Sequence, residues 1–254
     1  MKGRTKEAVS GSRKGKKPSL YGRFPLPVEL QSDSVRVAAM PEGEVVHYRR
    51  EAPCGVVEKT VVTSGGRLIV NPVEPVNLPQ SISTTLLLHF VRPVVVEPKG
   101  RVVLFLTFPI EVGVFIARQQ AVEMLDVFCL LPSKFTLYGP QGGGRVCKYW
   151  RSKVSFVPPT VKPLEEGVLA LTVTNATPRW VEVNRAVFHA HGMKLFFGSA
   201  LVAMQAEMRI TAADMAETQF VDRPLHEGMK KSLEVYRARK LSTVMTRFMM
   251  EYGL

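Results

Sequence analysis

The sequence predicts a mostly β fold, arranged as one extended or two abutting antiparallel β-sandwiches, with a long C-terminal amphipathic α-helix. Two continuous apolar runs, TLLLHFVRPVVV and RVVLFLTFPI, are typical of central strands covered on both faces. Other segments alternate between apolar and polar residues, and turn residues separate them at intervals, as in a β-sandwich. Only the last part of the chain changes to helical spacing.

The chain is long enough for a substantial core, and it is strongly basic. It has 254 residues, 46% of them hydrophobic, with 34 Lys and Arg against 22 Asp and Glu and a net charge of +12. Residues 1–19 show no apolar period, so we expect a disordered basic arm. Such an arm either docks on phosphates through counterion release or is simply solvated. The candidate phosphate-binding residues of the arm are Arg13, Lys14, Lys16 and Lys17.

The strand pattern after the arm predicts two β regions. Residues 20–157 are expected to form one sandwich lobe, and residues 164–221 a second lobe or a continuation of the same sandwich. The proline-rich stretch at 158–163 is a weak boundary between them. The turn EPKG joins the two long apolar runs with Pro and Gly where a reversal needs them.

Two alternating segments in the second region, LALTVTN and WVEVNRAV, are linked by NATPR, which predicts a hairpin-type connection. In the later segment Val181, Val183 and Val187 are expected to share one face, with Arg185 as the exception.

Residues 222–254 are predicted to be the C-terminal helix, either as one long helix or as two helices broken near Lys240. Asp222 can cap it, Pro224 suits its first turn, and apolar residues follow at helical spacing. The stripe would cover either the β-core of the same chain or a second copy in a homodimer. The stripe residues proposed for this packing are Leu241, Val244, Met245, Phe248 and Met249.

A glycine-rich stretch, KFTLY followed by GPQGGG and RVCKYWRSKVSFV, predicts a hairpin with the glycines at its tip. It lacks the Lys-Ser or Lys-Thr of a phosphate-binding loop, and no helix follows it. With a period of two, Trp150, Val154 and Phe156 point inward. The outward face is then a cationic ladder with one aromatic residue: Arg145, Tyr149, Arg151 and Lys153. This face suits a nucleic-acid backbone and a stacked base, and the alternative is a solvated strand whose cations blunt a sheet edge.

Motifs for catalysis or metal binding are weak. His189 and His191 have a spacing used in metal sites, but no carboxylate follows in GMKLFF. The three cysteines are far apart and form no CxxC pair, and neither GxSxG nor HExxH occurs. The sequence therefore nominates no catalytic residue, metal or cofactor. An enzyme with a spatially assembled site stays an alternative.

Targeting signals are not evident either. The basic start continues into SGSRKGKKPS rather than an apolar region, and no run of about 18 apolar residues occurs. We therefore expect a cytoplasmic protein without a transmembrane helix.

Several stretches together resemble one known family: VNPVEPVNLP, FPIEVGVFI, FTLYG with VCKYWRSKV, EEGVLALTVTN, WVEVNRAVF, HGMKLFF, AEMRI, MKKSLEVYRARK and MEYGL. The chain is similar over about residues 20–254 to an archaeal family known only as a domain of unknown function, number four hundred and thirty-two. The resemblance implies an archaeal cytoplasmic protein and supplies no catalytic residues.

The basic arm and the cationic strand favour a non-enzymatic binder of RNA or of a ribonucleoprotein. In its concrete form this is a ribosomal-subunit-associated factor acting as a homodimer. The alternative from another class is an interaction or regulatory module whose partner is a protein, including one at a membrane surface.

Overall fold

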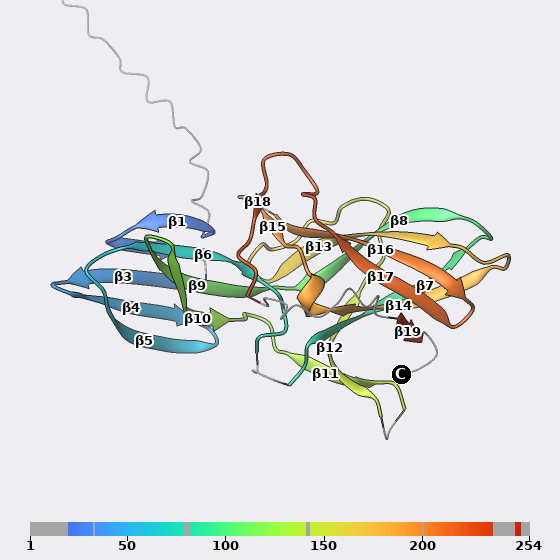
Figure 1. Ribbon diagram of the computed structural model, residues 1–254, viewed down its shortest axis with the longest axis horizontal. Coiled ribbons are helices and arrows are strands. Elements are labelled where there is room, and N and C mark those ends of the chain that lie inside the picture. The colour runs from blue at the N-terminus through green and yellow to red at the C-terminus, as the bar shows by residue number, and fades with distance from the viewer. Residues whose placement is uncertain are drawn as a thin grey trace, which may run out of the picture.

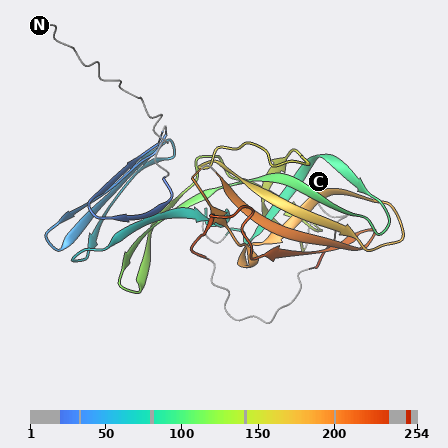
Figure 2. The same ribbon diagram turned by 90° about the horizontal axis from the view of Figure 1, so that it is seen from above.

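The structure is a computed structural model that describes residues 20–32, 34–78, 82–140, 143–199, 201–235 and 247–249. These residues form two β-sandwich lobes that lie end to end along the long axis (Figure 1). Figure 2 shows the same two lobes from above. The described part of the chain contains no α-helix, only a short 3-10 turn at Ala190–Gly192. The fold is therefore mostly β, as the alternating pattern predicted.

The N-terminal lobe consists of two four-stranded sheets, which we call sheets A and B. Sheet A has the spatial order β1 (Gly22–Pro25), β6 (Arg67–Val73), β9 (Glu111–Arg118) and β10 (Ala121–Phe128). Sheet B has the order β2 (Val28–Gln31), β3 (Arg36–Glu42), β4 (Val45–Ala52) and β5 (Gly55–Val62). All of their strand pairs are antiparallel.

A buried polar network joins the two sheets of this lobe. Arg50 of β4 donates from Nε to Asp126 Oδ2 of β10 at 2.8 Å, and the Tyr48 hydroxyl donates to the same oxygen at 3.0 Å. The Arg50 guanidinium also lies 5.0 Å from the centre of the Phe128 ring. The charge of Asp126 is thus paired and hydrogen-bonded, as a buried carboxylate requires.

The C-terminal lobe consists of sheets C and D. Sheet C is four-stranded, in the order β11 (Lys134–Tyr138), β12 (Arg145–Ser152), β7 (Thr85–Val96) and β14 (Val181–His189). Sheet D is seven-stranded. Its main path has the order β18 (Lys230–Lys231), β15 (Phe196–Phe197), β16 (Val202–Ala212), β13 (Glu166–Asn175) and β8 (Arg101–Pro109). Off this path, β17 (Met215–Val221) pairs with β16, and β19 (Arg247–Met249) pairs with β17.

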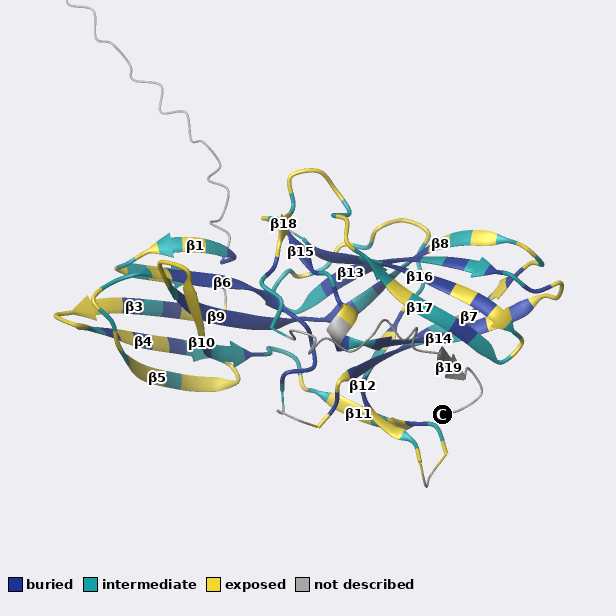
Figure 3. Ribbon diagram, in the orientation of Figure 1, coloured by how far each residue is buried: buried dark blue, intermediate teal, exposed yellow. Residues whose placement is uncertain are grey.

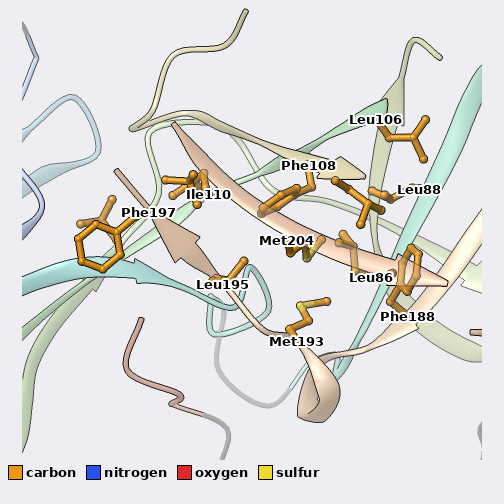
Figure 4. Packing of buried hydrophobic residues seen from close by; sticks show 14 of the residues in the cluster. Leu86, Leu88, Leu106, Phe108, Ile110, Phe188, Met193, Leu195, Phe197 and Met204 are labelled. Atoms are coloured by element: carbon orange, nitrogen blue, oxygen red, sulfur yellow. The ribbon is translucent and has the colours of Figure 1, made fainter. Parts of the chain in front are cut away.

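Both sheets of the C-terminal lobe are mixed, so the prediction of antiparallel sandwiches is wrong for this lobe. β12 pairs in parallel with β7, and β13 pairs in parallel with β16. Parallel neighbours need a crossover, which a reading of local turns does not reveal. The inner faces pack leucine, phenylalanine and methionine side chains from both sheets, including Leu88, Phe188 and Phe108 (Figure 4).

The two connections that were expected to reverse the chain within a sheet lead instead from one sheet to the other. The turn after β7 enters β8, so the apolar runs belong to sheets C and D, and β8 is an outer strand of sheet D. The NATPR link likewise joins β13 of sheet D to β14 of sheet C.

The fully buried side chain of Asn175 ties these two connections together. Its amide nitrogen donates to the carbonyls of Val96, Glu97 and Arg179 at 3.1, 2.9 and 2.7 Å. Its Oδ1 accepts the amide and the hydroxyl of Thr177 at 3.0 and 2.8 Å. One side chain therefore satisfies the polar backbone of two turns that would otherwise be buried without partners.

The chain alternates between the lobes. It leaves the N-terminal lobe after β6, makes β7 and β8, returns for β9 and β10, and then completes the C-terminal lobe. The stretch at 158–163 lies between β12 and β13, which both belong to the C-terminal lobe. β13 pairs with β8 and β14 with β7, so strands on the two sides of this stretch share sheets.

The predicted C-terminal helix is wrong. Residues 222–235 form turns and the short strand β18, in which Lys231 pairs with Phe196. Gly228 has a φ of 81°, which ends any right-handed helix, and the Lys231 ammonium bonds Asp222 Oδ2 at 2.5 Å. Phe248 and Met249 lie in β19, paired with β17. Leu241, Val244 and Met245 lie outside the described residues.

Candidate nucleic-acid interface

The predicted hairpin is present and carries the candidate interface. β11 and β12 pair antiparallel, with Leu137 opposite Val146 and Tyr138 opposite Arg145. Gly139, which follows β11, has a φ of 106°, a conformation that favours glycine. A side chain on Gly144 would meet the Pro140 carbonyl oxygen at 2.8 Å. Both glycines therefore serve the turn, which agrees with their role as a hairpin tip.

The two faces of β12 separate as the period of two predicted. Trp150 points toward the main core and donates from Nε1 to Thr107 Oγ1 at 3.1 Å, and Val154 packs against the same core. Arg145 and Arg151 are exposed, and Tyr149 is half-buried on their face. Lys153 is exposed just after the strand. Phe156, expected inside, is 69% exposed because the chain has left the sheet before this residue.

Pairing across sheet C adds residues that β12 alone did not indicate. Lys134 lies opposite Tyr149, and His89 of β7 lies beside both Arg151 and Arg185. Residues opposite one another share a face of the sheet. We call this the outer face of sheet C, and its cationic or aromatic members near β12 are Lys134, Arg145, Tyr149, Arg151, His89 and Arg185.

Arg185 reaches this face because of a β-bulge. The register of β14 against β7 shifts between Val183 and Arg185. Val183 therefore packs in the main core, whereas Val187 packs in a separate small cluster with Leu87, Tyr138 and Cys147. The expected shared face of the valines is wrong beyond Val183, since a bulge inverts the alternation that follows it.

The apolar cluster forms the floor of the outer face, and polar groups lie around it. The Tyr149 hydroxyl and His89 Nδ1 are 3.2 Å apart, and their rings are 6.0 Å apart at 31°. Burial lowers the pKa of His89, and the charges of Arg151 and Arg185 lower it further. Burial also raises the pKa of Tyr138 to about 12 and that of the Cys147 thiol to about 11. At neutral pH the cations of this face are therefore its lysine and arginines.

The face has almost no depth. A cavity of about 30 Å³, lined by Leu87, His89, Thr136, Tyr149 and Arg185, is the hollow found there. That volume holds about one or two water molecules. A deep pocket for a small molecule is therefore not what this face offers, whereas an extended polymer can lie across it.

The strands of sheet C carry little negative charge of their own. Of the described residues on β11, β12, β7 and β14, Glu182 is the one with a carboxylate. It pairs with Val95, six residues along β7 from His89, which corresponds to about 20 Å along a strand. The described residues of these four strands therefore contribute mainly positive charge around β12.

On its other face β12 is anchored to the junction between the lobes. Lys148 is 2% exposed, and its ammonium lies 2.6 Å from Oε1 of Glu111 in β9, which is fully buried. Glu111 also accepts the backbone amides of Asn77 at 2.8 Å and Leu78 at 3.2 Å. This pair escaped the sequence analysis, since only the fold brings positions 111 and 148 together.

Other expected features gain no support as sites. The arm residues Arg13, Lys14, Lys16 and Lys17 lie outside the described residues. Where side chains are described, no cluster of three or more His, Cys, Asp and Glu could hold a metal ion. Within the same part of the chain, no helix is long and apolar enough to cross a membrane.

Comparison with known proteins identifies the family. No curated protein and no solved structure matches the chain. A family model described as "Protein of unknown function (DUF432)" matches residues 20–251, which include both lobes. The chain therefore belongs to the DUF432 family.

Proposed function

We propose that the protein binds single-stranded RNA, alone or in a ribonucleoprotein such as a ribosomal subunit, across the outer face of sheet C. The observation that carries the proposal is the group of exposed cations Lys134, Arg145 and Arg151 around Tyr149 on a shallow face. Among the described residues of its four strands, the one carboxylate lies far along the sheet. Proteins that bind single strands combine a basic track for the backbone with aromatic rings on which bases stack.

The spacing of these residues suits an extended ligand. Arg145 and Arg151 are six residues apart on one strand, which is about 20 Å. Tyr149 lies between them, and its hydroxyl is held near His89, so the ring has a defined position before the ligand arrives. Preorganised groups lose less entropy on binding.

The basic arm adds a second electrostatic contribution. Residues 1–23 carry eight Lys and Arg and one Glu, and the arm precedes the N-terminal lobe rather than sheet C. We therefore assign it a sequence-independent attraction to phosphates, separate from the contacts made on the strand face.

Fluorescence anisotropy with an oligouridylate of about 15 nucleotides tests the proposal at several salt concentrations. Three phosphate contacts from sheet C predict a slope of log K against log[salt] of about −2 for a protein without residues 1–19, and a steeper slope for the full chain. Replacing Arg145 and Arg151 by alanine should flatten either slope by about 1.4. Arg36→Ala on the outer face of sheet B is the matched control, since this exposed arginine pairs with Glu29.

The proposal is wrong if the full chain shows no salt-dependent binding at about 50 mM salt. It is equally wrong if the alanine variants at Arg145 and Arg151 keep the wild-type slope, or if Arg36→Ala flattens the slope as much as they do.

A further inference from the structure

We propose that the free edge of β11 accepts an extended acidic segment of a partner protein as an additional strand of sheet C. This surface differs from the outer face assigned to RNA, and the inference does not depend on the RNA proposal. β11 is an end strand of its sheet, and no strand among the described residues pairs with its other edge. Figure 3 shows the strand at the rim of the lobe, largely exposed.

The backbone groups on this edge can be assigned from the ladder. The carbonyl oxygen of Val146 accepts the Ser83 hydroxyl at 2.6 Å on the β7 side, so the backbone polar groups of Val146 face away from β11. Val146 lies opposite Leu137. In an antiparallel pair, bonded and non-bonded positions alternate, so the N–H and C=O groups of Leu137 and Phe135 point to the free edge.

The same residues present apolar side chains to solvent. Phe135 is 37% exposed, Leu137 is 39% exposed, and Val146 opposite Leu137 is 44% exposed. Ile82 is 47% exposed and directly precedes Ser83, which bonds the Val146 carbonyl. Strand addition uses main-chain bonds for affinity and alternate side chains for specificity, and this edge supplies both.

The charge around β11 indicates which kind of segment can pair with its edge. β11 and β12 carry the exposed cations Lys134, Arg145 and Arg151 and contain no acidic residue. If a second copy of the chain paired with this edge, Lys134 and Arg145 of one copy would lie near Lys134 and Arg145 of the other. The net charge of +12 on each chain would add to this repulsion. Like charges placed opposite one another destabilise a strand pair, whereas opposite charges stabilise it. An extended segment with alternating acidic and apolar residues therefore fits this edge best.

A soluble probe peptide of alternating glutamate and valine, about eight residues long and blocked at both ends, tests the inference on the full chain. Binding is measured by fluorescence anisotropy, and hydrogen exchange with mass spectrometry follows the amides of residues 134–138. We expect binding of this probe, slower exchange at Phe135 and Leu137, and no binding of the probe in which lysine replaces glutamate.

Variants at the edge separate backbone pairing from apolar contact. Phe135→Ala should weaken binding by about tenfold through lost side-chain burial. Phe135→Pro also removes an outward N–H that β12 does not use, so it should abolish binding. Leu137→Glu should abolish binding of the acidic probe by repulsion. Phe156→Ala, at an exposed phenylalanine away from this edge, is the matched control.

Thermal unfolding verifies that each variant is folded. Leu137→Glu and the exchange measurement keep the test decisive if the proline variant fails to fold. Absence of binding up to about 1 mM probe, or binding that persists unchanged in folded Phe135→Pro or Leu137→Glu, overturns the inference. Concentration-dependent dimerisation that protects residues 134–138 also overturns it, in favour of a second copy.

Discussion

The buried pair of Glu111 and Lys148 gives the most stringent test of how the lobes are held together. We expect Lys148→Met to remove the ammonium while leaving a carboxylate that is 0% exposed and that, among the described residues, is then bonded by the amides of Asn77 and Leu78. Removing one partner of a buried ion pair costs about 3–5 kcal/mol of unfolding free energy. Glu111→Gln should cost a similar amount, because it leaves the buried ammonium without its anion.

The double variant provides the decisive number. If the two charges act as a unit, Glu111→Gln combined with Lys148→Met removes both and leaves an amide oxygen for one backbone N–H. Its cost should then be about 3–5 kcal/mol, well below the sum of the single costs.

Equilibrium urea unfolding followed by circular dichroism measures these free energies, with comparison at constant m-value. Exposed Lys162, which pairs with Glu165 at the surface, provides the control, and Lys162→Met should change stability by less than about 1 kcal/mol. Additive costs in the double variant, or a loss below about 1 kcal/mol for Lys148→Met, would refute this reasoning.

Three further predictions follow from the geometry. Because burial and the neighbouring arginines lower the pKa of His89 from 6.5, its ring is neutral at pH 7. A bound phosphate favours the charged ring, so RNA affinity should rise as pH falls from 7 toward 5 in anisotropy titrations, and the rise should be smaller in His89→Gln. Asn175→Ala should cost about 3 kcal/mol in urea unfolding, since three carbonyls and two donors of buried turns lose their partner. Gly167→Ala should cost about 1–3 kcal/mol, because its Cβ would lie 2.4 Å from the Phe108 ring, whereas Gly198→Ala meets no atom within 4 Å and should be nearly neutral in thermal unfolding.

Local patterns sufficed for some of these features. The hairpin from Lys134 to Ser152 follows from apolar strands around glycine and proline, and the inward position of Trp150 follows from a period of two. Both depend on residues close in sequence, where turn chemistry and alternation act directly.

Other features depend on pairings that no local pattern contains. The turn after β7 has the residues of a reversal, yet it leads to another sheet, because the partners of β7 are β12 and β14. The apolar spacing of Leu225, Met229 and Leu233 is also compatible with an irregular segment, and the positive φ of Gly228 interrupts a helix there. Arg185 belongs to the outer face only because of a bulge in β14.

The alternation of the chain between its lobes has a consequence for how the protein is made. Sheet A cannot be completed until β9 and β10 have been synthesised, and these strands follow β7 and β8 in the chain. During that interval the long apolar strands β7 and β8 have no partners, since β12, β13 and β14 emerge later still. A nascent chain released before β14 would expose unpaired apolar strands, a state prone to aggregation. Because each lobe is built from two separate stretches of the chain, neither lobe can be removed or exchanged as one contiguous segment.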